Sequence, residues 1–227
     1  STAYKIYAEP TRMIPEGKIR ELSVISDPNV IKPEAVLTDK GGSCIGYTMR
    51  FVTDTHPLCR LFTLAFRNRT NFVQGNVTPL VQNMQKSVCN VHNSGALIVD
   101  LNEMNFLVNS AFNEVYFIDV DSYQTKSFPA TALMASVRDW KTPLGKFTEL
   151  SDWFSFAVVS FQLYAGIHPF KGKHSVKGLE ERMQQNISVF NSNVQAPKVC
   201  FPFDAIPQAY RNWYKAVFED GIRAEPP

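Results

Sequence analysis

The chain has 227 residues, of which 44% are apolar, and its 23 basic and 21 acidic side chains leave a formal net charge of +2. This length and apolar content are enough for a sizeable core, in one domain or in two closely packed lobes. Because the charge is nearly balanced, the composition gives no indication of a nucleic-acid or membrane-surface partner.

The cysteines are far apart and form no C-x-x-C pair; they are Cys44, Cys59, Cys89 and Cys200. Such spacing predicts neither a zinc site nor a dense disulfide framework. The first residues lack a basic region followed by an apolar run, and no apolar stretch reaches the length that spans a bilayer. We therefore expect a cytoplasmic protein with reduced thiols and no membrane partner.

The first part of the chain, residues 1–52, consists of short apolar runs broken by Pro and Gly. This pattern is typical of strands, and the runs cover residues 3–7, 36–37 and 45–52. Between the first two runs, residues 15–25 fit a short helix. A small strand-rich part is therefore expected at the beginning of the chain.

Two strong helices are predicted in the remainder of the chain. The first covers residues 79–93, with Thr78 as its cap and Gly95 at its end, and its apolar residues share one face. The second begins at Ser151, a good capping residue, and ends near Gly166. Because this second helix is apolar nearly all round, we expect it to be buried at the centre of a helical part.

Polar residues with regular spacing lie between the two helices, next to two short strands predicted at residues 106–108 and 115–118. Asp100 precedes Asn105 by five residues, and Asp119 follows Asn105 by fourteen. Each acid comes after an apolar run, so both carboxylates can emerge from buried elements into one cleft. Phosphoryl transfer needs such a set, with one carboxylate to orient the acceptor hydroxyl and oxygen ligands for magnesium.

These spacings resemble the motifs of protein kinases. Asp100 with Asn105 matches the catalytic-loop pattern D-L-x-x-x-N, and Asp119 matches the Asp of D-F-G. Residues 151–172 resemble the kinase stretch S-D-x-W-S-F…G-x-x-P-F-x-G, and residues 2–5 resemble V-A-I-K. The sequence around Asp100 and Asp119 is similar to that of an atypical bacterial and phage group within this superfamily. Some members of the group carry a helix-hairpin-helix extension.

The resemblance implies an α+β, two-lobed, protein-kinase-like fold. Residues 1–52 would form a small, truncated, β-rich N-lobe with the hinge, and residues 53–227 a larger helical C-lobe. Only Ser1 and Thr2 precede the V-A-I-K-like segment, so the glycine-rich loop is expected to be missing from this chain. Either the chain is a fragment, or the lid over the nucleotide is absent.

The resemblance also implies ATP- and Mg²⁺-dependent transfer of phosphate to a Ser or Thr hydroxyl of a protein substrate. Asp100 would orient the acceptor and Lys5 would steady the phosphates, while Asn105 and Asp119 would bind magnesium. The residues expected around the nucleotide are Ala3, Lys5, Met49, Arg50, Val52 and Leu107. Of these, Met49 would be the gatekeeper, and Ala3 and Leu107 would enclose the adenine from either side.

Neighbouring positions depart from the kinase pattern. The His and Arg expected before the catalytic Asp are Ile98 and Val99, which argues against activation by loop phosphorylation. Asp121 replaces the glycine of D-F-G, and we expect it to have a structural role. The partner of Lys5 is open between Glu16 and Glu21, because the count from the kinase pattern falls between them.

Two further expectations concern residues outside the cleft. Asp152 would anchor the catalytic loop from the central helix, and a candidate ion pair joins Asp139 to Arg223. The departures keep a second hypothesis open, a catalytically impaired pseudokinase that acts as a binding or scaffold module. A small-molecule phosphotransferase of related fold is a third, which the stretch 151–172 disfavours.

Overall fold

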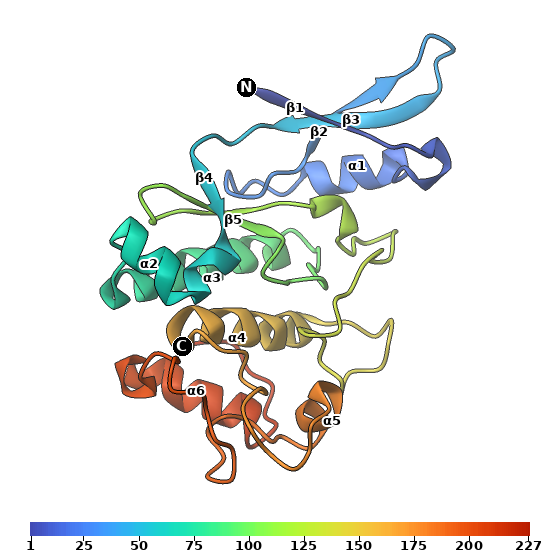
Figure 1. Cartoon of the computed structure of the whole chain (residues 1–227). Coiled ribbons are helices and arrows are strands. Elements are labelled where there is room, and N and C mark those ends of the chain that lie inside the picture. The colour runs from blue at the N-terminus through green and yellow to red at the C-terminus, as the bar shows by residue number, and fades with distance from the viewer.

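The computed structural model describes residues 1–227, with all side chains except that of Pro10. Its strand-rich part is a three-stranded antiparallel sheet in the order β1-β3-β2, with one helix, α1, beneath it (Figure 1). The bounds are β1 Thr2–Ile6, α1 Glu16–Ser23, β2 Pro33–Thr38 and β3 Cys44–Arg50. Three strands and one helix were therefore predicted correctly in this region.

A second antiparallel sheet lies between the first sheet and the large helices, with its strands in the order β4-β5-β6. The bounds are β4 Thr55–Pro57, β5 Phe106–Asn109 and β6 Val115–Phe117. Residues 106–109 and 115–117 agree with the two predicted strands to within one residue. The strand β4, which directly follows the strand-rich part, was not predicted.

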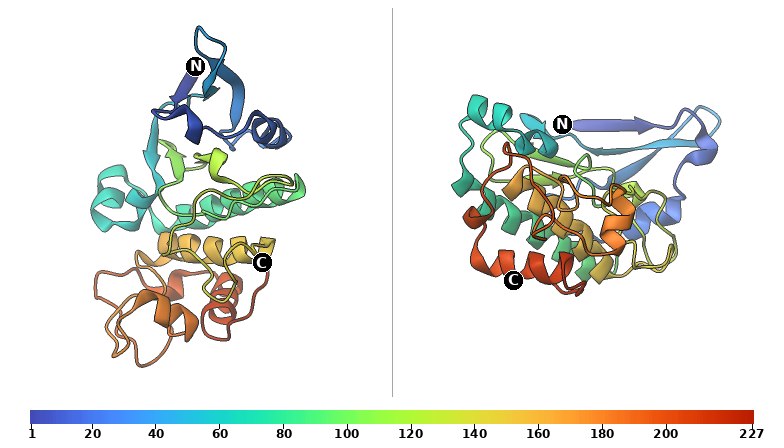
Figure 2. Two further views of the ribbon diagram at one scale, coloured as in Figure 1. Left: turned by 90° about the vertical axis from the view of Figure 1, so that its right-hand side faces the viewer. Right: turned by 60° about the horizontal axis from the view of Figure 1, so that its bottom comes forward.

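The helical part is layered around α4, which lies between α3 on one side and α6 on the other (Figure 1). The bounds are α2 Leu64–Thr70, α3 Val77–Asn93, α4 Glu149–Ala165, α5 Leu179–Gln184 and α6 Gln208–Phe218. Short 3-10 turns are η1 Pro10–Arg12, η2 Leu58–Phe62, η3 Gln74–Asn76, η4 Val120–Ser122 and η5 Phe203–Ala205. In the side view, the first sheet with α1 forms one end of the molecule and the helices form the other (Figure 2).

Helix α4 is buried from Ser151 to Ala165, as its continuous apolar pattern predicted. Its cap was predicted wrongly. The hydroxyl of Thr148 accepts the backbone N–H of Ser151, and the hydroxyl of Ser151 in turn accepts the N–H of Thr148. This reciprocal pair of hydrogen bonds is a capping box. Thr148 and Ser151 are both residue types that cap helices, and the cap is Thr148, the first of the two. Gly166 ends the helix with a φ of 69°, a conformation that glycine adopts without strain.

Helix α3 starts at Val77, two residues earlier than predicted. Thr78 is therefore not its cap but part of its first turn, and the Thr78 hydroxyl accepts a hydrogen bond from Tyr164 on α4 at 2.9 Å. The predicted end is correct, since Gly95 follows the helix with a φ of 79°. The contact with Tyr164 was not visible in the local pattern, because it depends on how α3 and α4 pack.

The molecule thus combines two small antiparallel sheets with six α-helices among its described residues. This mixed α+β architecture is compatible with the kinase-like fold that the motifs imply. None of the described helices has both the length and the apolar character needed to cross a membrane.

Candidate functional site

A cavity of about 500 Å³ lies between the first sheet and residues from the stretch 105–119, which includes β5 and β6. Its walls include every residue expected around the nucleotide: Ala3, Lys5, Met49, Arg50, Val52 and Leu107. Both expected metal ligands, Asn105 and Asp119, also line it. Residues from four separate parts of the sequence, and Ile31 from a fifth, are therefore brought together at one site.

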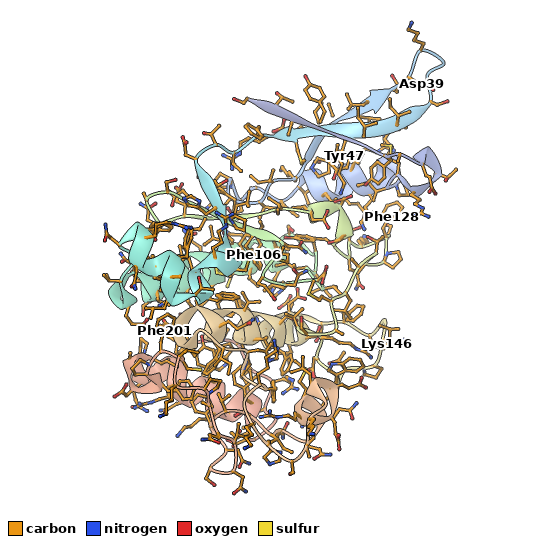
Figure 3. All side chains as sticks on the ribbon, viewed as in Figure 1. Asp39, Tyr47, Phe106, Phe128, Lys146 and Phe201 are labelled. Carbon is orange, nitrogen blue, oxygen red and sulfur yellow. The ribbon has the colours of Figure 1, made fainter. Side chains whose placement is uncertain are left out.

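The antiparallel pairing of β1 with β3 explains how the sheet contributes to this cavity. In the register, Ala3 lies opposite Met49 and Lys5 opposite Tyr47. Since side chains alternate between the faces of a strand, these four point to the same side, and the intervening Tyr4 is 65% exposed on the other. Figure 3 labels Tyr47 on this part of the molecule.

Gly46 allows the two strands to approach. A Cβ atom at Gly46 would lie 2.1 Å from the carbonyl oxygen of Lys5, which is far inside van der Waals contact. Glycine at residue 46 therefore allows β1 to pair closely with β3 and so to place Lys5 at the cavity. On the opposite wall, the alternation along β5 buries Phe106 and Val108 in the core and leaves Leu107 to face the cavity.

The loop before β5 is fixed from below by Asp152 on α4. Its fully buried carboxylate accepts the backbone N–H groups of Ile98 and Val99 at 2.7 and 2.9 Å, and His92 Nε2 lies 3.0 Å away. These contacts agree with the anchoring role expected for Asp152. Val99 has a φ of 62°, an unfavourable value for a β-branched residue, so the loop holds a strained backbone just before Asp100.

Asp100 itself is buried, and within the described chain it is the one expected site residue that does not line the cavity. Its Oδ1 accepts the backbone N–H of Met134 at 2.7 Å. The side-chain nitrogen of Asn105 donates to the carbonyl oxygen of Asp100 at 3.0 Å. Asn105 thereby connects Asp100 to the cavity, and its amide oxygen is the end left for a cation.

Asp119 follows β6 at the mouth of the cavity. Its backbone is left-handed, with a φ of 60°, and its side chain is 43% exposed. The Nζ atom of Lys5 donates to its carboxylate at 2.9 Å. A carboxylate this open to solvent can exchange its partner at little cost, since exposed ion pairs contribute little stability.

The main correction concerns the partner of Lys5. Neither expected glutamate contacts it: Glu16 pairs with Arg20 at 2.9 Å, and the Glu21 carboxylate accepts the backbone N–H of Ser127. Lys5 instead donates to both carboxylate oxygens of Asp121, at 2.9 and 2.8 Å. The sequence analysis did not predict this contact, because the kinase pattern places the partner of the lysine on a helix.

Asp121 is held by more than Lys5. Its side chain is 8% exposed and accepts a hydrogen bond from the hydroxyl of Tyr7. Burial by itself raises the pKa of Asp121, but hydrogen bonds from Lys5 and Tyr7 and the positive charge of Lys5 leave it below its ordinary value. Burial lowers the pKa of Lys5, and the carboxylates of Asp121 and Asp119 more than offset this. The pair is therefore ionised at neutral pH.

The position on α1 that the kinase pattern reaches is occupied by Lys18, which is 1% exposed. Its Nζ donates to the carbonyl oxygen of Pro129 at 3.2 Å. Burial lowers the pKa of Lys18, and the negative charge of Asp121 acts in the opposite direction. Helix α1 thus presents a cation, not a carboxylate, toward the region of Asp121.

The predicted pair of Asp139 and Arg223 is present. Nε and Nη2 of Arg223 donate to the two carboxylate oxygens of Asp139 at 2.7 and 2.8 Å, the two-pronged geometry of a strong ion pair. It connects the loop before α4 to the end of the chain. His168 is also buried, and its Nε2 lies 2.8 Å from the carbonyl oxygen of Ser136.

No protein-family model matches the chain. Two curated relatives, from Escherichia coli (strain K12) and Escherichia coli O157:H7, are both named Protein kinase YegI. Each is 23% identical over 251 residues, an alignment that covers 98% of this chain and 39% of the relative. The chain thus spans well under half the length of these relatives. The likeness supports a distant, kinase-like relationship that extends over nearly the whole chain.

Proposed function

We propose that the cavity binds ATP with magnesium and that the protein transfers the terminal phosphoryl group to a Ser or Thr hydroxyl of a protein substrate. The observation that carries this proposal is the single cavity shared by Lys5, Asn105 and Asp119. A cation for phosphates and two oxygen donors for a metal are the groups that phosphoryl transfer requires. The distant relationship to a protein named as a kinase points the same way.

The apolar part of the cavity fits a flat base. Ala3 and Met49 are cross-strand neighbours on the first sheet and Leu107 is on β5, and all three line the cavity. The chain leaves β3 after Arg50, and the backbone N–H of Phe51 still donates to the carbonyl oxygen of Ser1 at 3.0 Å. The backbone of Val52, beyond this bond, would offer hydrogen bonds to the base edge. Pockets of this kind, mostly apolar with a few placed polar groups, are typical of nucleotide sites.

The polar end of the cavity fits the phosphates and magnesium. Asp119 would give a carboxylate oxygen to the metal and Asn105 its amide oxygen, since the amide nitrogen already donates to Asp100. When bound, magnesium neutralises charge on the phosphates and orients them. Lys5 would exchange its exposed bond to Asp119 for a phosphate oxygen.

Asp100 would act on the acceptor. Its Oδ1 accepts the N–H of Met134 at 2.7 Å, whereas its Oδ2 accepts a longer bond, 3.4 Å, from the side-chain nitrogen of Asn105. Oδ2 is therefore the oxygen that would accept the hydrogen bond from the substrate hydroxyl. The hydroxyl oxygen then forms a bond to the terminal phosphorus while the bond from that phosphorus to the β-phosphate oxygen breaks, and the hydroxyl proton is taken up by Asp100.

A second candidate is a binding module without transfer activity. The observation that favours it is the bond between Lys5 and Asp119, which couples the proposed phosphate ligand to the proposed metal ligand. If this bond persisted with nucleotide present, neither group would reach its target. ATP binding would then be weak or independent of magnesium.

The test compares the unaltered chain with Asp119→Ala and Asp100→Asn in Mg²⁺-dependent ATP binding by calorimetry and in transfer of labelled phosphate to protein. We expect Asp119→Ala to lose magnesium-dependent binding, and Asp100→Asn to bind ATP but lose transfer by at least ~100-fold. The exposed Asp204→Asn is the matched control. Absence of ATP binding by the unaltered chain would overturn the proposal, and binding without any transfer would favour the binding module.

A further inference from the structure

Lys5 makes two hydrogen bonds to Asp121 and one to Asp119. We propose that Asp121 is the carboxylate that positions Lys5 for the phosphates, in place of a glutamate from α1. The phosphate role of Lys5 rests on the proposed function, but the pairing of Lys5 with Asp121 can be tested without it. Asp121 is a positioning residue in this scheme, because it acts through Lys5.

Asp119 and Asp121 differ in burial, and this difference suits them to different roles. The side chain of Asp119 is 43% exposed, whereas that of Asp121 is 8% exposed. A buried carboxylate that loses its partner is left as an unpaired charge, so its ion pair is hard to break. Asp119 can therefore leave Lys5 for a metal, while Asp121 keeps hold of it.

The strand β1 and the turn η4 fix the geometry of this pair. Lys5 and Tyr7 are two positions apart, so both point to the side of the sheet that faces η4, and both donate to Asp121. On the other side, the backbone N–H of Ser122 donates to the carbonyl oxygen of Asp119 and closes the turn. The carboxylate is thus held by the turn that carries it and by two side chains, Lys5 on β1 and Tyr7 directly after this strand.

The backbone at position 121 explains why a side chain is accepted there. Positive φ values occur at Asp119 but not at Asp121 among the described residues, so nothing in this turn requires glycine at position 121. A carboxylate can therefore occupy the position without strain. Glu16 and Glu21 both have other partners, and the α1 side chain that feels the charge of Asp121 is Lys18, so no acidic group of α1 takes the place of Asp121.

The first experiment measures the titration of the Lys5 amine in the absence of nucleotide. The chain is labelled with an amine-acylating reagent across a pH series, and the modified Lys5 peptide is quantified by mass spectrometry. Asp121→Asn, which keeps the shape of the side chain, should move the midpoint of Lys5 labelling to lower pH, and by more than Asp119→Asn does. The double variant Glu16→Gln/Glu21→Gln should leave the midpoint unchanged.

A midpoint that stays unchanged in Asp121→Asn, or that moves in the glutamate double variant, would overturn the pairing. If Asp121→Asn does not fold, as judged by circular dichroism, Lys5→Met gives the reciprocal measurement. The ¹³C carboxyl resonance of Asp121 should then titrate at higher pH than in the unaltered chain. An unchanged Asp121 titration would equally reject the pairing.

The second experiment tests positioning in the reaction. Asp121→Asn should raise the KM for ATP by at least about tenfold, as expected for the loss of a charge-assisted contact, and Asp121→Glu should recover part of it. The glutamate double variant should keep the KM of the unaltered chain. An unaltered chain with no transfer activity would refute the proposed function, while the labelling result would still decide whether Asp121 pairs with Lys5. Should transfer occur with an unchanged KM in Asp121→Asn, the positioning role is rejected.

Discussion

The carboxylate of Asp152 and the imidazole of His92 lie 3.0 Å apart between α4 and α3, both almost completely buried. The same carboxylate accepts two backbone N–H groups from the loop that leads to Asp100. One side chain thereby connects the two largest helices to the loop next to the candidate site.

Asp152→Ala should therefore destabilise the fold by ~2–5 kcal/mol, since it leaves two buried N–H groups and His92 without their acceptor. Urea unfolding followed by tryptophan fluorescence measures this change. Glu180→Ala, at an exposed position of α5, is the control and should change the free energy of unfolding by less than ~0.5 kcal/mol. A loss of similar size in both variants would contradict the anchoring role.

Gly46→Ala should separate β1 from β3. The added Cβ would lie 2.1 Å from the carbonyl oxygen of Lys5, so the strands must move apart, at a cost of ~1–3 kcal/mol. Because Lys5 is carried on β1, ATP affinity should fall as well. Gly75→Ala is the matched control, since a Cβ there meets nothing within 4 Å. Thermal unfolding and calorimetric ATP titration measure the two effects, and equal behaviour of both variants would count against the strand contact.

Arg223→Gln should reduce the dependence of stability on acid. Burial raises the pKa of Asp139, but its bonds to Arg223 and the Arg223 charge prevail and lower it. A lowered pKa in the folded state means that the ion pair stabilises the protein above the ordinary pKa of Asp, and that this contribution is lost as the pH falls through the folded value. The difference in urea unfolding free energy between pH 7 and pH 3 should therefore be smaller in Arg223→Gln, and an unchanged difference would contradict the pairing.

His168 should make a contribution that is also lost as the pH falls, but in a higher pH range. Burial lowers the pKa of His168 to about 4, despite the carbonyl oxygen of Ser136, so the folded protein holds the ring neutral. In the unfolded chain the ring takes up a proton near pH 6.5. The contribution of His168 to the free energy of unfolding is therefore fully present above that pH and is lost as the pH falls toward 4. His168→Gln should flatten the stability profile between these limits. A profile that keeps its slope would show that other groups are responsible.

The gathering of Lys5, Asn105 and Asp119 at one cavity could be expected from the sequence because the motifs that carry them are local. Asp100, Asn105 and Asp119 are close together in the chain, and their spacing with the apolar run of α4 is specific. Residues 2–5 were recognised from four side chains, and the pairing of β1 with β3 then brought them to the cavity.

The partner of Lys5 could not be predicted, because it depends on how η4 packs against β1, more than 100 positions away in the chain. One sequence feature pointed to this contact. Tyr7 lies two residues after Lys5, so its hydroxyl is a second donor on the same face as Lys5, and both donate to Asp121. The short elements β4 and α2 were missed for a different reason. A three-residue strand and a seven-residue helix have too little periodicity to be recognised, and tertiary packing stabilises them.

The arrangement of Lys5, Asp121 and Lys18 also limits how the chain can vary. Asp121 pairs with Lys5 from β1, and its negative charge also acts on Lys18 of α1. A change to glycine at position 121 would leave Lys5 with Asp119 alone and Lys18 without this compensating charge. A relative with glycine at that position is therefore expected to carry an acidic side chain in place of Lys18. The two positions should covary, and an alignment of homologues would show the exchange of an acid in the turn for an acid on the helix.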